Sequence, residues 1–186
     1  LEKKGYYIKL NDMKDLILKS TLTKKLKKDV ILNICKLKNT HWKYGVRSQL
    51  KWFYEHIQDN DIHNLAYIKK KLVGYILLRK KNFLSKKLKL NYLYYDTLIV
   101  AKKYRKHKIA YKLTNLAAKV IIKSKLHSML LCEKKNETFY KKNKWKKMNT
   151  KNFKILDHEY SKKLLMMSFN LKATKIKNNI NYYIFS

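Results

Sequence analysis

The sequence has 186 residues, of which 46% are hydrophobic, and its 46 lysines and arginines outnumber 12 aspartates and glutamates to give a formal net charge of +34. This length and hydrophobic content suit one globular domain with a buried core, so we expect no second domain. The longest apolar runs, such as Leu72–Leu78, are far shorter than the ~18 residues that indicate a membrane span, and we expect no membrane partner.

The positive charge is spread along the whole chain. Arginine occurs only at positions 47, 79 and 105, so almost all of the 46 basic residues are lysines, and Asn, Ile and Tyr are abundant beside 3 glycines and no proline. This composition is typical of codon drift in an AT-rich genome. We therefore interpret the lysines mainly as a solvated surface and expect no specific nucleic acid partner, with a dedicated nucleic-acid-binding face as the alternative.

Both cysteines, Cys35 and Cys132, lie in apolar runs. This placement predicts reduced thiols in the core of a cytoplasmic protein and no disulfide framework. The sequence has no His, Cys, Asp and Glu residues at metal-ligand spacing, no P-loop and no Gly-x-Ser-x-Gly motif. We therefore expect neither a metal site nor a redox cofactor.

The N-terminal part of the chain predicts a strand followed by helices. Alternating apolar residues predict a strand over Tyr6–Leu10. Apolar residues at every fourth position predict one amphipathic helix over Met13–Leu37, or two helices with a break near Thr21–Lys24. A second helical face follows over Val46–Ile57.

A hairpin is predicted next. Leu65 and Tyr67 belong to its first strand, Lys69–Lys71 form its turn, and Leu72–Leu78 form its second strand. Gly74 lies in the middle of that second strand, which indicates either a bulge or the close approach of another segment. The polar residues from 82 to 89 predict an exposed loop.

The middle of the chain predicts a strand, helix, strand, helix unit. Tyr92–Val100 is apolar on nearly both faces, which is typical of a central strand, and the basic turn Ala101–His107 follows it. Apolar residues at three- and four-residue intervals predict a helix over Ile109–Ile121, and Met129–Cys132 and Phe139–Trp145 predict a second strand and a short helix. The free N–H groups at the start of the first helix favour an anion such as a phosphate.

The C-terminal part predicts two closing strands, Phe153–Leu156 and Leu164–Leu171. Residues 172–179 form a basic linker, and Ile180–Phe185 is an apolar tail that the pattern does not assign to an element. We therefore expect one domain over residues 1–171, followed by a linker and short tail over 172–186.

The middle segment also resembles a known family. Arg105–Ala110 reads RKHKIA and resembles the Gln/Arg-x-x-Gly-x-Gly/Ala signature of the GNAT superfamily of N-acyltransferases. Asp96–Val100, Leu131–Glu133 and Phe139–Trp145 resemble that family's fourth strand, fifth strand and fourth helix, loosely in the manner of the arylalkylamine N-acetyltransferase branch. The chain departs from the pattern twice, because lysine replaces glycine at positions 108 and 144.

The resemblance implies an α/β (α+β) fold with a mixed, mostly antiparallel sheet of about six to seven strands flanked by about four helices. It implies an acyl-CoA-dependent N-acyltransferase that transfers acetyl from acetyl-CoA to a primary amine by direct attack in a ternary complex. The acceptor is a small molecule or a protein amino group, and a homodimer is left open. The alternatives are a basic nucleic-acid-binding protein and a family member that has kept the fold and lost turnover.

The resemblance also implies which residues bind the donor. Backbone groups of the central strand would pair with the pantetheine arm and supply an oxyanion donor, and the basic turn would hold the pyrophosphate. The residues concerned are Leu98, Ile99, Val100, Arg105, Lys106, His107, Lys108, Ile109 and Ala110.

Three residues are candidates for the catalytic groups. Tyr140 lies where the family's general acid lies, with a packing role as the alternative. Asp96 is the first candidate for the base, because a carboxylate inside an apolar strand is costly unless it is paired or used; the alternative is an ion pair with a lysine. Glu133 is the second candidate, acting through a water molecule.

Four side chains near the predicted helices could shape the acceptor pocket. The family resemblance implies that these helices form one wall of the acceptor site. The alternative is that the four are core residues. They are His41, Trp42, Trp52 and Tyr54.

Overall fold

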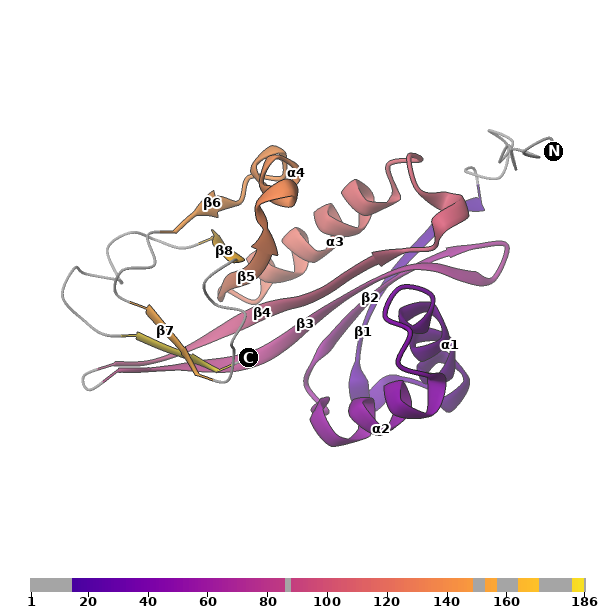
Figure 1. Cartoon of the computed structure of the whole chain (residues 1–186), viewed down its shortest axis with the longest axis horizontal. Coiled ribbons are helices and arrows are strands. Elements are labelled where there is room, and N and C mark those ends of the chain that lie inside the picture. The colour runs from indigo at the N-terminus through magenta and orange to yellow at the C-terminus, as the bar shows by residue number, and fades with distance from the viewer. Residues whose placement is uncertain (1–14, 86–87, 149–152, 157–163, 171–181, 186) are drawn as a thin grey trace. The chain divides into compact units, whose positions relative to one another are not determined.

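The computed structural model describes residues 15–85, 88–148, 153–156, 164–170 and 182–185 (Figure 1). Two compact units divide the chain. The first takes in the chain to Leu77 together with Thr97–Leu116, and the second takes in Leu78–Asp96 and the chain from Ala117 onward. The long elements β3, β4 and α3 pass through both units.

The first unit is built from four neighbouring strands, in the order β1-β2-β3-β4, and from helices. Its elements are β1 (Ile17–Leu22), the 3-10 turn η2 (Thr23–Lys25), α1 (Lys28–Asn39), α2 (Val46–His56), β2 (Ile62–Ile68), the start of β3 (Lys71–Ser85), the end of β4 (Leu88–Val100), the 3-10 turn η3 (Lys102–Tyr104) and the start of α3 (Ile109–Lys123). The predicted hairpin with its lysine turn is confirmed as β2 and β3.

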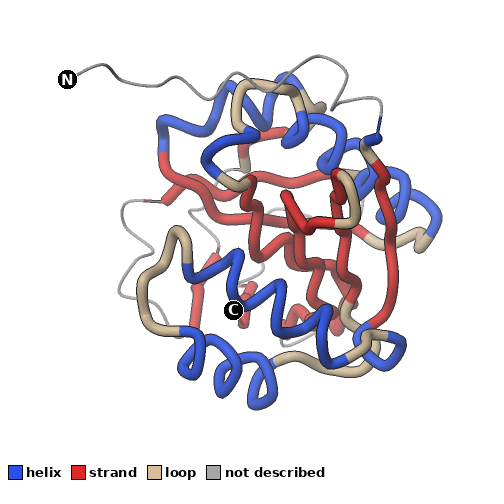
Figure 2. The backbone as a smooth tube through the Cα atoms, turned by 90° about the vertical axis from the view of Figure 1, so that its right-hand side faces the viewer, coloured by secondary structure: helices blue, strands red, loops and turns tan. Residues whose placement is uncertain are grey.

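Helices flank the strands of the first unit on both faces (Figures 1 and 2). Leu65, Tyr75 and Leu77 are buried in one cluster with Ile34 and Leu37 of α1. The intervening strand positions face the other way, because successive side chains of a strand alternate between its faces. This second face carries the start of α3.

Gly74 lies on the face that carries α3. A Cβ atom at this position would lie 2.8 Å from the Cδ1 atom of Leu113, 3.2 Å from the Cγ2 atom of Ile109 and 3.4 Å from the Cβ atom of Ala66. Of the two alternatives for a glycine in this strand, the structure therefore shows the close approach of another segment. Because residue 74 has no side chain, the first two turns of α3 can pack directly against β2 and β3.

The predicted helix over Met13–Leu37 is wrong for its first half. Residues 17–22 form β1, which pairs antiparallel with β2 from Ile17↔Tyr67 to Leu22↔Ile62, and α1 begins at Lys28. A four-residue spacing is also a multiple of two, so it fits one face of a strand as well as a helix, and pairing with β2 decides between them. The strand predicted over residues 6–10 lies outside the described residues.

The second unit continues the sheet in the order β3-β4-β5-β8-β6. Its further elements are the end of α3, β5 (His127–Glu133), the 3-10 turn η4 (Lys134–Asn136), α4 (Glu137–Lys142), β6 (Lys146–Lys147), β7 (Phe153–Leu156), β8 (Leu164–Phe169) and β9 (Tyr182–Phe185). Strands β4 and β5 are parallel, whereas β8 is antiparallel to both β5 and β6. The predicted mixed, mostly antiparallel sheet of about six to seven strands flanked by about four helices is confirmed, because seven strands form the main path β1-β2-β3-β4-β5-β8-β6, and β7 and β9 pair beside it.

The predicted loop over residues 82–89 is wrong, because β3 extends to Ser85 and β4 begins at Leu88. Strand β9 pairs antiparallel with this part of β3, through Phe83↔Ile184 and Leu84↔Tyr183, and parallel with β7. The polar residues at the end of β3 thus form a strand because their backbone pairs with β9, which is distant in the sequence. The tail that the sequence pattern left unassigned contains β9, and the predicted linker over 172–179 lies outside the described residues.

Lysine occupies most of the left-handed backbone positions. Among the described residues, the non-glycine positions with positive φ are Lys69 (48°), Lys70 (61°), Lys106 (69°), Lys108 (59°), Lys125 (56°), Lys144 (67°) and Asn170 (57°). Glycine and asparagine adopt this conformation most readily, because a Cβ atom crowds the backbone there. Both positions where lysine replaces the family's glycine therefore keep the backbone that glycine favours.

Lys144 shows why its position favours glycine. The N–H of Trp145 donates to the carbonyl of Tyr140 at 3.1 Å, and the N–H of Lys144 donates to the carbonyl of Lys141 at 2.9 Å. These two bonds form a Schellman motif that ends α4, with Lys144 at the left-handed position that is usually glycine.

We expect Lys144→Gly to raise the free energy of unfolding by about 1 kcal/mol, because relief of the left-handed strain outweighs the extra freedom of glycine in the unfolded chain. Urea denaturation measures the change. The matched control is Lys142→Gly, which places glycine inside α4 and should lower the free energy of unfolding by about 0.5–1 kcal/mol. Equal destabilisation by both substitutions would contradict the assignment.

His63 is a fully buried histidine in the first unit. Its Nδ1 atom lies 2.9 Å from the Tyr75 hydroxyl and its Nε2 atom lies 2.8 Å from the Thr23 hydroxyl, and its ring stacks on Tyr75 at 5.8 Å. Burial lowers the pKa of His63 from 6.5 to about 4. The folded protein therefore holds a neutral ring at a pH where the unfolded chain already binds a proton.

This lowered pKa makes the folded state lose stability as the pH falls from about 6.5 to about 4, because only the unfolded chain takes up the proton. The loss from this group should reach about 3 kcal/mol. We expect the stability advantage of the wild type over His63→Gln, measured by urea denaturation, to shrink by that amount between pH 7 and pH 4. If the difference in the free energy of unfolding between the wild type and His63→Gln stays constant with pH, His63 does not have a lowered pKa. His41→Gln, at an exposed site, serves as the control.

Candidate active site

The basic turn of the first unit connects the end of β4 to the start of α3. The N–H of Ala101 donates to the carbonyl of Val73 at 2.9 Å, which ties the beginning of the turn to β3. The 3-10 turn η3 follows, closed by the N–H of Tyr104 donating to the carbonyl of Ala101 at 2.8 Å. The side chain of Tyr104 is buried, so the turn is anchored at its centre.

Arg105 fastens the turn to the strand before it. Its Nε atom donates to the carbonyl of Val100 at 3.1 Å, and the residue is exposed. The donor is the Nε–H of a rigid, planar guanidinium group, which a lysine side chain lacks. Arg105 therefore has a structural contact in addition to the phosphate-binding role that the family resemblance implies.

The two residues with positive φ in this turn, Lys106 and Lys108, lie directly before α3. The N–H of Lys112 donates to the carbonyl of Lys108 at 3.0 Å, so the helical hydrogen bonds begin there. The N–H groups of the first helical turn have no partner within the helix and point out of its N-terminus, where they and the helix dipole favour an anion. Lys106 and Lys108 are exposed and His107 is half-buried.

The last residues of β4 lead into this turn. Ile99 and Val100 are buried, Leu98 is half-buried, and Ile109 at the start of α3 is 1% exposed. These side chains are therefore packing residues. Any part they take in donor binding would involve their backbone N–H and C=O groups.

Tyr140 lies on α4 in the second unit and is buried among aromatic rings. It meets Tyr95 edge-on at 5.9 Å between ring centres, and Trp145 and Phe139 at 6.0 Å and 5.2 Å. Burial raises the pKa of Tyr140, and the neighbouring Cys132 raises it further. The phenol thus keeps its proton at neutral pH, which a general acid requires.

Asp96 is partly buried in the second unit and forms an ion pair. Its Oδ2 atom lies 3.3 Å from the Nη1 atom of Arg79, and the two side chains are 20% and 10% exposed. Such a pair offsets the cost of burying a carboxylate in an apolar strand. The alternative to a catalytic role for Asp96 was an ion pair with a lysine, and the structure shows the ion pair with an arginine in place of the lysine.

Glu133 lies at the end of β5 on the surface of the second unit. Its Oε2 atom is 2.7 Å from the Nζ atom of Lys135, and both side chains are more than half exposed. An exposed pair of this kind contributes little to stability. Glu133 is therefore open to solvent, as a base that works through water would be.

The four aromatic candidates for the acceptor pocket lie in the first unit. Trp42 and Trp52 pack against the buried cluster of α1, β2 and β3, and the Nζ atom of Lys38 lies 4.0 Å from the centre of the Trp52 ring. His41 stands edge-on to Trp42 and is exposed, as is Tyr54 at 62%. The tryptophans thus serve the core, whereas His41 and Tyr54 are accessible to a ligand.

Sequence reasoning missed Arg79 as the partner of Asp96. One signal could have identified it, because Arg79 is one of three arginines in a chain whose basic residues are otherwise lysines. Cys35 and Cys132 are free and buried, as predicted, and burial raises the pKa of both thiols to about 11. Among the described residues, no group of three or more His, Cys, Asp and Glu side chains could hold a metal ion, and no helix is long and apolar enough to cross a bilayer.

Comparison with known structures identifies the fold. Escherichia coli ElaA matches with a TM-score of 0.61 at 12% identity, over 82% of this chain and 98% of ElaA. Arabidopsis thaliana Naa50, solved with the bisubstrate analogue CoA-Ac-MVNAL, matches with a TM-score of 0.57 at 22% identity, over 83% of this chain and 98% of Naa50. An aminoglycoside 6'-N-acetyltransferase complexed with coenzyme A matches with a TM-score of 0.61 at 14% identity, over 83% and 98% of the two chains.

No curated protein matches the sequence. The sequence profile of the Acetyltransferase (GNAT) family, however, matches residues 31–143, which is more than half of the chain and spans α1 to α4. The protein is therefore a member of the GNAT acetyltransferase family, whose members use acetyl-CoA as co-substrate.

Proposed function

We propose that the protein transfers the acetyl group of acetyl-CoA to a primary amine by direct attack within a ternary complex. The observation that carries this proposal is the turn before α3. Lys108 replaces the glycine of the family signature, and its φ of 59° keeps the backbone conformation that the glycine would provide. This conformation supports a phosphate site at the N-terminus of α3.

In this proposal the pyrophosphate of acetyl-CoA binds the N–H groups at the start of α3, between Lys106 and Ala110. Three cations of the turn, Arg105, Lys106 and Lys108, add charge-assisted hydrogen bonds, and His107 contributes backbone. The pantetheine arm pairs with backbone groups of Leu98–Val100. The register between β4 and β5 runs from Tyr92↔His127 to Tyr94↔Met129, so these β4 residues lie beyond that pairing.

The reaction requires a neutral amine, whose nitrogen attacks the thioester carbonyl carbon. A backbone N–H at the end of β4 stabilises the oxyanion as the tetrahedral intermediate forms. The C–S bond then breaks, and the leaving thiolate takes the phenol proton of Tyr140, whose raised pKa keeps it protonated. The proton of the attacking amine passes to Asp96, or through water to Glu133.

The acceptor in this proposal is an amino group of a small molecule or a protein. Similar folds occur in Naa50, solved with a peptide-containing bisubstrate analogue, and in an aminoglycoside 6'-N-acetyltransferase. The net charge of +34 repels polycationic acceptors at long range. We therefore favour an acceptor with a single amine and low positive charge.

We expect Tyr140→Phe to lower the rate of acetyl transfer by ~100-fold or more while acetyl-CoA affinity stays nearly unchanged, because a proton donor acts mainly in the transition state. A panel of amines, with thiol release as the readout, first identifies an acceptor. The rate is then compared for the wild type and the variant.

Tyr95→Phe is the matched control, because Tyr95 is a buried neighbour of Tyr140 and loses the same atom. Its rate should stay close to that of the wild type. If Tyr140→Phe turns over as fast as the control, Tyr140 is a packing residue and the proton comes from elsewhere.

A further inference from the structure

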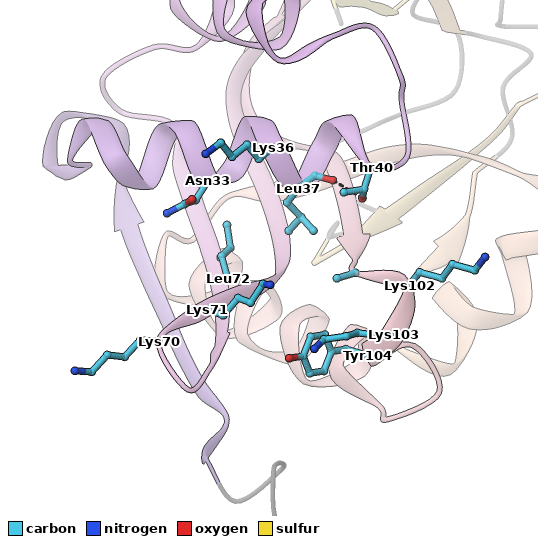
Figure 3. A pocket seen from close by; sticks show the side chains of 11 residues that line it. Asn33, Lys36, Leu37, Thr40, Lys70, Lys71, Leu72, Lys102, Lys103 and Tyr104 are labelled. Atoms are coloured by element: carbon cyan, nitrogen blue, oxygen red, sulfur yellow. Dashed lines mark hydrogen bonds between the residues drawn. The ribbon is translucent and has the colours of Figure 1, made fainter. Parts of the chain in front are cut away.

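A pocket of about 360 Å³ opens in the first unit, where three segments meet (Figure 3). The last turns of α1, the turn between β2 and β3, and the η3 turn after β4 each contribute to its wall. The first half of the basic turn, Ala101–Tyr104, lines the pocket, whereas Leu98–Val100 and Arg105–Ala110, which we assign to acetyl-CoA, do not.

Five lysines line the pocket, and none of the lining residues is acidic. Figure 3 shows the ammonium groups of Lys71 and Lys103 directed inward, with that of Lys103 beside the Tyr104 ring, whereas the side chains of Lys36, Lys70 and Lys102 start at the rim and point away from the pocket. In the described part of the chain, none of these five forms an ion pair. Two ammonium groups thus lie within one concave space whose lining carries no acidic residue, and three more leave from its rim.

The floor of the pocket is apolar. Leu37, Leu72 and Tyr104 line it and are 6%, 9% and 7% exposed. The hydroxyl of Thr40 is already engaged, because it donates to the carbonyl of Leu37 at 2.7 Å. An apolar, water-poor floor lowers the local dielectric and strengthens the attraction of the lysines for an anion placed above it.

The backbone beneath two groups of these lysines is fixed. Lys70 has a φ of 61° in a two-residue hairpin turn, the geometry that matches the twist of the flanking strands. Lys102 and Lys103 lie in η3, which is closed by the bond from Tyr104 to Ala101, and the Nζ atom of Lys103 lies 4.7 Å from the centre of the Tyr104 ring. The backbone that carries Lys70, Lys102 and Lys103 is thus set by these turns, and the Nζ atom of Lys103 rests beside the Tyr104 ring.

We propose that this pocket binds a compact polyphosphate group of a small molecule that is a separate ligand from acetyl-CoA. Lysine ammonium groups are point charges with three donors each, and several of them around one space suit an anion that carries several phosphate charges. Lys71 and Lys103 hold the phosphates from within the pocket, and the three lysines that start at its rim attract the anion at longer range. The diphosphate of coenzyme A offers the same chemistry, so the experiment separates the two sources.

The test is calorimetric titration of inorganic tripolyphosphate, without metal ions, into the full chain at 150 mM salt. We compare the wild type with Lys71→Gln/Lys103→Gln, which empties the middle of the pocket. The matched control is Lys112→Gln/Lys119→Gln, which removes the same charge from exposed positions of α3. We expect one saturable site, a loss of about 10-fold or more in affinity for the first pair, and less than about twofold for the control.

Three outcomes would overturn the proposal. Equal losses in both pairs would show that tripolyphosphate responds to the diffuse charge of the chain. A larger loss in Lys106→Gln/Lys108→Gln than in the pocket pair, or displacement of tripolyphosphate by coenzyme A, would place the anion in the turn before α3. Undiminished binding to the coenzyme-saturated protein supports a separate site.

Discussion

The start of α3 reaches the strands of the first unit because residue 74 has no side chain. A Cβ atom there would lie 2.8 Å from Leu113 and 3.2 Å from Ile109, and both of these residues are essentially fully buried. Since Lys108 immediately precedes Ile109, this contact also fixes the direction in which the N-terminal N–H groups of α3 point. Arg105, bonded to Val100, holds the other end of the turn. The anion site that we propose for acetyl-CoA depends on both restraints.

Lysine stands at two positions where the family pattern has glycine, and the backbone of both Lys108 and Lys144 is left-handed. A left-handed conformation costs a lysine about 1 kcal/mol or more compared with glycine, so each such position carries a small penalty that the surrounding hydrogen bonds must offset. The Schellman motif at Lys144 and the first helical bond at Lys108 supply such restraints. Gly74 is glycine for a different reason. Its φ is not positive, and a Cβ atom there would meet the packed side chains of Leu113 and Ile109. Packing, and not backbone conformation, therefore restricts residue 74 to glycine.

Local patterns predicted much of the fold. Apolar periodicity gives the order of elements from β4 to α4. The spacing of the family motif placed Lys108 and Lys144 at glycine positions, and both are left-handed in the structure. Long-range pairing decided the rest. Residues 17–22 fit either a helix face or a strand until β2 pairs with them, and β9 lies about 100 residues after the part of β3 it extends. The Asp96–Arg79 pair and the lysine pocket likewise join segments that no local pattern links.

The most direct measurement is calorimetric titration of acetyl-CoA into the wild type and Lys108→Gly. We expect saturable one-to-one binding by the wild type. In the variant we expect a loss of about 1.5–3 kcal/mol in binding free energy, because the turn keeps its shape and loses a charged hydrogen bond to phosphate. Lys112→Gln, one turn further along α3, should bind like the wild type. The absence of saturable binding by the wild type, or tighter binding by the glycine variant, would contradict a phosphate site built on Lys108.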